Sequence, residues 1–132
     1  MWTWALAAFL VAHGAVHACY LAEPPEPDDA VASWPFTIDR SWVLSGLGVR
    51  PERVTAVGRA LTVVVLATFA VAAVSVVVGT GWWEVAAVVA ASVSLVQMLA
   101  WFHPWLSFGI LIDVLLIVGV TGSWAPLRQL AG

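Results

Sequence analysis

A small set of ionisable or amide side chains lies within long apolar stretches of the sequence. The set comprises His13, His17, Arg59, Gln97, His103 and Asp113. Ionisable groups inside membrane helices are costly and usually face the interior of a bundle, so these residues are the first candidates for chemistry. Imidazole, guanidinium and carboxylate groups together could anchor a hydrogen-bonding ligand or coordinate a metal ion.

The spacing of these residues predicts which of them meet. His13 and His17 are four positions apart and therefore share one face of a helix, and Gly14 beside them allows a neighbouring helix to approach closely. Gly109 and Asp113 repeat this spacing in the last apolar stretch. Because the first and fourth helices of an up-and-down bundle are neighbours, we expect a hydrogen bond between His13 and Asp113.

Depth along the helices places most of these groups in one half of a bundle. Counted from the nearer span end at about 1.5 Å per residue, they lie roughly 6 to 12 Å deep. We therefore predict one ligand-binding cavity, lined by His13, His17, Arg59, Gln97 and Asp113. Purely structural roles are the alternative, in which Arg59 extends to the interface and the histidines and Asp113 only bridge helices.

The composition indicates that the main solvent of this chain is a lipid bilayer. Hydrophobic residues make up 62% of the 132 residues and charged residues 10%, and the mean hydropathy is +0.97, far from an ordinary soluble domain. The net charge of −3 and the absence of a basic patch give no indication of nucleic-acid binding. The single cysteine, Cys19, excludes a disulfide or CxxC centre within one chain.

Four apolar stretches each approach the length of about 20 residues that crosses a bilayer. They are residues 2–21, 54–78, 82–103 and 105–124. Backbone groups in lipid must be paired within their own segment, so the predicted class is all-α. We expect the first stretch to be retained rather than cleaved, since no positive charge precedes it. Short connections at 79–81 and around residue 104 force the last three helices into antiparallel hairpins.

The prediction is therefore a single transmembrane domain, 1–132. It is an integral membrane antiparallel four-helix bundle with both termini at one end, called here the terminal end, and a long loop, 22–53, at the other, called the loop end. The apolar part of this loop, 33–49, is expected to lie along the interface or fold back over the bundle.

Tryptophans and arginines predict how the bundle sits in a cell membrane. Tryptophans prefer the membrane–water interface, and here they would form two belts: Trp2, Trp4, Trp82, Trp83 and Trp124 at the terminal end, Trp101 and Trp105 at the loop end. Arginines gather on the cytoplasmic side of membrane proteins. The loop end has Arg40, Arg50, Arg53 and Arg59, and the terminal end has Arg128, which predicts a cytoplasmic long loop.

The string His13-Gly14-Ala15-Val16-His17 resembles the HGxxH pattern of small four-span bacterial and archaeal membrane proteins of the DoxX-like type. Further similarities are Gly58-Arg59 near the start of the second span, the segment 92–95, and Gly109 followed by Asp113. Each motif is short, and together they cover most of the chain. The resemblance implies a four-helix membrane fold and an association with quinone-linked or other respiratory membrane enzymes.

Three functions fit the sequence. In the first, the polar pocket binds a lipophilic small molecule such as a quinone or lipid. In the second, the chain is a non-catalytic subunit or assembly factor, whose small residues at 86–94 pack against another membrane protein or a second copy of this chain. In the third, a metal or haem is ligated by members of the set His13, His17, His103 and Asp113.

Other classes have less support. A permease is the least expected, because four spans leave little room for a central pathway. No nucleophile–base pair, phosphate-binding loop or zinc-spacing motif appears in the sequence. The sequence therefore predicts no enzyme class and identifies no cofactor.

Overall fold

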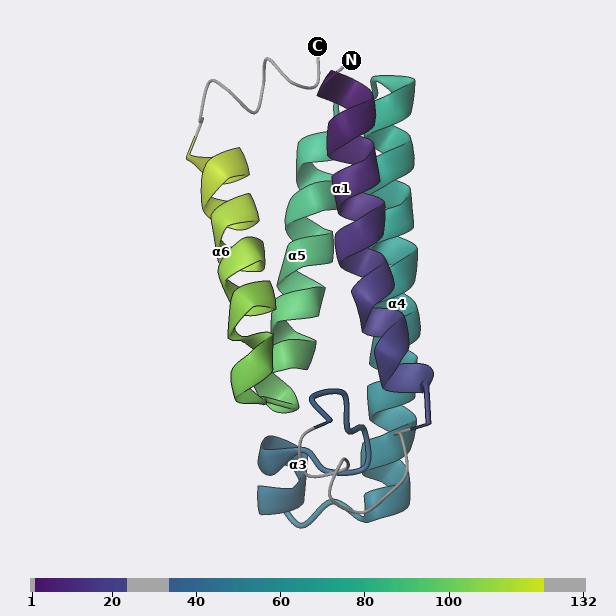
Figure 1. The fold of residues 1–132 in the computed structure, drawn as a ribbon, viewed down its shortest axis with the longest axis vertical. Coiled ribbons are helices and arrows are strands. Elements are labelled where there is room, and N and C mark those ends of the chain that lie inside the picture. The colour runs from purple at the N-terminus through teal and green to yellow at the C-terminus, as the bar shows by residue number, and fades with distance from the viewer. Residues whose placement is uncertain (1, 24–33, 123–132) are drawn as a thin grey trace.

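The computed structural model describes residues 2–23 and 34–122, and it confirms the prediction of an all-α bundle (Figure 1). Helix α1 (Trp2–Val16) continues into a 3₁₀ turn, η1 (His17–Leu21). A short helix, α3 (Trp42–Gly46), precedes the long helix α4 (Pro51–Val78). Helix α5 (Trp83–Ala100) is followed by the 3₁₀ turn η2 (Pro104–Leu106) and helix α6 (Ser107–Thr121).

Within the described residues, four helical stretches are long and apolar enough to cross a membrane: Trp2–Leu21, Pro51–Val78, Trp83–Ala100 and Pro104–Thr121. They run in alternating directions, so that the start of α1, the end of α4 and the end of α6 lie at the same end of the molecule (Figure 1). Many valines and leucines on these helices are exposed on the outside of the bundle. Such a surface suits lipid as its solvent.

Local sequence explains where α4 begins and ends. It begins at Pro51, earlier than the expected residue 54, because proline fits the first helical position and Arg50 before it is extended. It ends at Val78, because the next residue, Gly79, adopts a left-handed conformation with φ of +71°. The tight turn after Gly79 leads directly into α5, as the sequence predicted.

The helices pack in chain order around α4 and α5. Helix α1 packs on α4, α4 on α5, and α5 on α6, whereas the contact between α1 and α6 is far less extensive. Gly14 lets α1 approach α4, because a Cβ at this position would lie 2.6 Å from the Cβ of Phe69. The bundle therefore has a loosely packed seam between α1 and α6.

The small residues of α5 pack inside the chain's own bundle. Ala86, Ala87, Ala90, Ala91 and Ser94 are all buried. One of the three functions that fit the sequence, the subunit role, expected this face to pack against another membrane protein or a second copy of the chain. These small side chains belong to the bundle core instead, where Ala86, Ala87 and Ala90 cluster with residues of α1 and α4.

Two apolar clusters make up the core of the part of the chain that the structure describes. One lies toward the terminal end and includes Leu10, Val65 and Ala90. The other lies toward the loop end and includes Tyr20, Val54 and Met98. Along α1 with η1, α4 and α5, the buried polar residues His17, Thr62, Ser94 and Gln97 fall between members of these two clusters, so they form a layer with apolar packing on both sides.

The segment 34–49 folds back over the loop end of the bundle. Its side chains cap the end of α5: Ser41 Oγ donates to the carbonyl of Ala100 at 2.7 Å, and Trp42 Nε1 donates to the carbonyl of Leu99 at 2.6 Å. These carbonyls belong to the last turn of a helix and have no partner within it. The segment therefore closes the end of the bundle.

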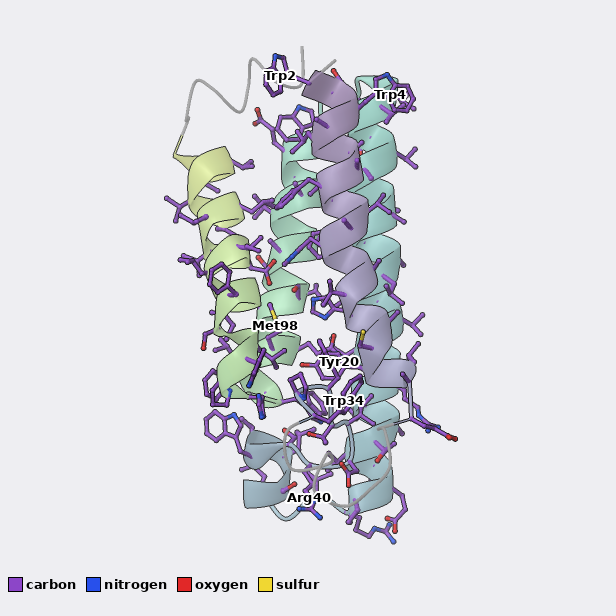
Figure 2. The ribbon with its side chains drawn as sticks, in the orientation of Figure 1. Trp2, Trp4, Tyr20, Trp34, Arg40 and Met98 are labelled. Atoms are coloured by element: carbon purple, nitrogen blue, oxygen red, sulfur yellow. The ribbon has the colours of Figure 1, made fainter. Side chains whose placement is uncertain are left out.

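The tryptophan belts are present in part. Trp2, Trp4 and Trp82 at the terminal end and Trp105 at the loop end are exposed, and Figure 2 shows the first two at the start of α1. Trp101 was expected at the interface but is buried, because its Nε1 donates to the carbonyl of Ile38 in the folded-back segment. Trp124 and Arg128 lie outside the described residues.

Replacing Ser41 with alanine is expected to lower the free energy of unfolding by about 1–2 kcal/mol. The change removes both the cap on Ala100 and the bond that Ser41 Oγ accepts from the backbone N–H of Leu44. Thermal unfolding in detergent measures the effect. Ser45→Ala is the matched control, since Ser45 lies exposed in the same short helix, and equal losses in the two variants would contradict the capping role.

Candidate functional site

The polar layer is built from one or two residues on each spanning helix. His13 on α1 and His17 in η1 point to the same side, as their spacing predicted. Asp113 comes from α6, and Ser94 and Gln97 come from α5. These five residues, with Thr62 and the carbonyl of Gly58 on α4, form one continuous hydrogen-bond chain, which we call the polar chain.

Asp113 connects His13 to Ser94 in the polar chain. His13 Nε2 donates to Asp113 Oδ1 at 2.8 Å, which is the hydrogen bond expected from the sequence. Ser94 Oγ donates to the other carboxyl oxygen, Oδ2, at 2.5 Å. Asp113 is fully buried, so its carboxyl group depends on these two donors in place of water.

His17 connects Ser94 to Gln97 in the polar chain. Its Nε2 lies 2.8 Å from Ser94 Oγ, and its Nδ1 lies 3.2 Å from Gln97 Oε1. Gln97 Nε2 donates to Thr62 Oγ1 at 2.6 Å and to the carbonyl of Gly58 at 3.5 Å. Thr62 Oγ1 in turn donates to the same carbonyl at 3.0 Å. The chain thus ends on the backbone of α4.

His13 is the outer member of the polar chain. Its side chain is 8% exposed, whereas Asp113, Ser94 and Gln97 are fully buried. The imidazole ring stacks on Phe9, with centroids 6.0 Å apart, and meets Phe69 edge-on at 5.2 Å. Phe9 is itself 42% exposed. His13 therefore links the buried layer to the outer surface of the bundle at the seam between α1 and α6.

Arg59 does not belong to the polar chain. It was expected to line the cavity, but the structure places it on the exposed face of α4, because its neighbour Gly58 occupies the face that packs against the folded-back segment. A Cβ at Gly58 would lie 2.5 Å from Ile38. The alternative of an arginine that extends toward the interface agrees with this placement.

The ligand-binding cavity expected between these polar residues is filled by the residues themselves. The polar atoms of the cluster bond to one another directly and leave their space filled by side chains. A cleft of about 450 Å³ does open at the loop end, and its lining is separate from the polar chain: Thr37, Arg40, Ser41, Trp42, Ser45 and Phe102. The polar chain is therefore a closed hydrogen-bonded layer.

The residues proposed as metal or haem ligands are not all brought together. His103 lies in the turn before η2, half-exposed, where its Nδ1 accepts from the backbone N–H of Trp105. Within residues 2–23 and 34–122, no group of three or more His, Cys, Asp or Glu side chains is placed to hold a metal ion. His13, His17 and Asp113 are joined through hydrogen bonds and the Ser94 hydroxyl instead.

Ser94 and Thr62 are members that sequence reasoning missed. Hydroxyl residues are common in membrane helices and bond to their own backbone, so their type alone gave no signal. Spacing could have found them: Ser94 and Gln97 are three apart, and Gly58 and Thr62 are four apart, so each pair shares a helix face.

Comparison of this chain with protein-family profiles, with curated proteins and with solved structures gives no match.

The bond between His13 and Asp113 is expected to contribute a coupling energy of about 1 kcal/mol, the scale measured for interhelical hydrogen bonds in membranes. A double-mutant cycle with His13→Ala and Asp113→Ala, read by unfolding in detergent, measures it. The control cycle pairs His13→Ala with Arg59→Ala and should be additive. Additive losses in the first cycle would show that the bond contributes nothing to stability.

Proposed function

We propose that this chain is an integral membrane protein that binds a lipophilic small molecule of the quinone class at the seam between α1 and α6. The observation that carries the proposal is the position of His13. It combines a ring edge at the bundle surface with a direct hydrogen bond to the buried Asp113 carboxyl. A molecule dissolved in the bilayer could reach it without entering the loop end.

The chemistry of the seam favours a flat ring with a hydroxyl group, as in the reduced (quinol) form of a quinone-class molecule. Phe9 and His13 lie nearly parallel, with an angle of 8° between their planes, and offer stacking surfaces. Because His13 Nε2 donates to Asp113, Nδ1 of the neutral ring is an acceptor, and the described residues place no hydrogen-bond donor on it, so it can accept from a ligand hydroxyl. The apolar side chains around the seam suit the hydrocarbon tail of such a molecule.

The other two functions draw less support from the geometry. The subunit role had the small residues of α5 as its contact surface, and these residues are buried within the bundle. A metal or haem site would need His103 beside the other histidines, and His103 lies in the exposed turn instead. The DoxX-like resemblance, with its quinone-linked association, agrees with the proposal and remains a prediction from the motifs.

A decyl-substituted benzoquinol is expected to raise the thermal unfolding temperature of the purified protein in a saturable way, since a ligand that binds the folded state stabilises it. His13→Leu should weaken the apparent affinity at least about tenfold, the equivalent of about 1.4 kcal/mol. His103→Leu is the control and should behave as the wild type. Decylbenzene, which lacks oxygen, should produce a smaller shift, and equal shifts from the two compounds would exclude specific recognition.

We also propose that the loop end faces the cytoplasm. The proposal rests on Arg40, Arg50, Arg53 and Arg59, which all lie at that end of the described structure. In a Cys19→Ser background, a cysteine replacing the exposed Ser45 should react with a membrane-impermeant maleimide in inside-out vesicles and not in intact cells. Labelling in intact cells would reverse the orientation.

A further inference from the structure

We infer that the polar chain binds one proton, shared between His17 and Asp113 through the hydroxyl of Ser94. The inference follows from the directions of the hydrogen bonds and requires no bound molecule. That this proton lies beside a bound quinone-class molecule rests on the proposed function. The protein would then hold a proton inside the membrane, separated from the bundle surface by His13.

The direction of the polar chain is set at its α4 end. Thr62 Oγ1 donates its hydrogen to the carbonyl of Gly58, so the oxygen of Thr62 can only accept from Gln97. The amide nitrogen of Gln97 therefore faces α4, and its Oε1 faces His17. Because an amide oxygen only accepts, His17 must carry a hydrogen on Nδ1.

Ser94 then faces two groups with one hydrogen. If His17 were neutral, its Nε2 would be an acceptor, and if Asp113 were ionised, its Oδ2 would also be an acceptor. The hydroxyl of Ser94 lies 2.8 Å from the first atom and 2.5 Å from the second. It cannot donate to both, and the bond left without a hydrogen would set two lone pairs against each other. One additional proton removes this conflict.

The additional proton has two possible positions. In one form it lies on Nε2 of His17, which donates to Ser94, while Ser94 donates to the Asp113 carboxylate. In the other it lies on Asp113 Oδ2, which donates to Ser94, while Ser94 donates to neutral His17. Both forms leave the His17 and Asp113 pair with no net charge. This suits a fully buried layer between two apolar clusters, where an unbalanced charge would be costly.

The two forms interconvert by a balanced transfer along the serine. The O–H bond of Asp113 breaks as its proton moves to Ser94 Oγ, and the former O–H bond of Ser94 breaks as its proton moves to His17 Nε2. One N–H bond and one O–H bond result, and no other reactant is needed. The hydroxyl of Ser94 is therefore the element that makes the proton shared.

The titratable neighbours of this pair are His13 and Tyr20, and of these His13 is the one that bonds to Asp113. From α1, His13 contacts Asp113, and its ring centroid lies 6.1 Å from that of His17. Tyr20 stacks on His17 at 6.0 Å. The polar side chains that α4 and α5 contribute to the layer, Thr62, Ser94 and Gln97, are uncharged, and Arg59 faces outward. The path from Asp113 to the bundle surface thus runs through His13.

Two spectroscopic measurements on the full chain, in lipid nanodiscs without quinone near neutral pH, test the inference. Infrared spectra report a protonated carboxyl group, and nitrogen NMR of ¹⁵N-histidine reports a ring with hydrogens on both nitrogens. We expect one of these signals, or a fast-exchanging average of both, in the wild type. A carboxylate at Asp113 together with a His17 that has one N–H would overturn the inference.

The variants assign the signals. Asp113→Asn places an amide N–H where the carboxylic acid would donate, so it should fold and should lose the carboxyl or doubly protonated histidine signal. Ser94→Ala is the second variant, because it keeps both titratable groups but removes the bridge, and it should shift the same signal. His103→Gln is the matched control and should leave the signal unchanged; loss of the signal in this control would assign the proton elsewhere and overturn the inference.

The spectra test the proton site and the ligand titration tests the proposed function, so either hypothesis can be contradicted without the other. A shared proton without quinone-dependent stabilisation would overturn the proposed function and leave the proton site standing. Saturable quinone binding with neither protonation signal would do the reverse.

Discussion

The buried carboxyl group of Asp113 is the constraint on which the arrangement of the bundle depends. A carboxyl group without water must receive hydrogen bonds from the protein, and Asp113 receives one from α1 and one from α5. These two bonds tie α6 to both helices at one depth. Without them, α6 would be held to the rest of the bundle chiefly by its packing on α5.

The polar layer gives register to helices whose other contacts are not selective. Valine, leucine and alanine side chains on both sides of the layer could pack at several rotations and offsets, since lipid is as apolar as the core. A chain of directional hydrogen bonds through α1, α6, α5 and α4 is satisfied at one offset only. The same chain gives the bundle a path along which a proton can move.

The folded-back segment closes the loop end of this arrangement. Its Ser41 and Trp42 side chains supply donors to the last carbonyls of α5, and Ile38 receives the indole N–H of Trp101. Phe36, Ile38 and Leu44 also pack on the apolar cluster beneath it. The polar layer is thereby separated from the aqueous side by apolar packing, which leaves the seam at His13 as its nearest approach to the surroundings.

The sequence by itself determined the four spans, their antiparallel order, and the meeting of His13 with Asp113, because apolar length, short turns and helical spacing are local properties of the chain. Only the tertiary structure decided that Ser94 and Thr62 join the polar chain, that Arg59 and His103 stay outside it, and that Trp101 is buried. These outcomes depend on the rotation of each helix about its own axis. That rotation is fixed by neighbouring helices and by the folded-back segment, and nearly uniform hydrophobicity around each helix gives no local signal of it.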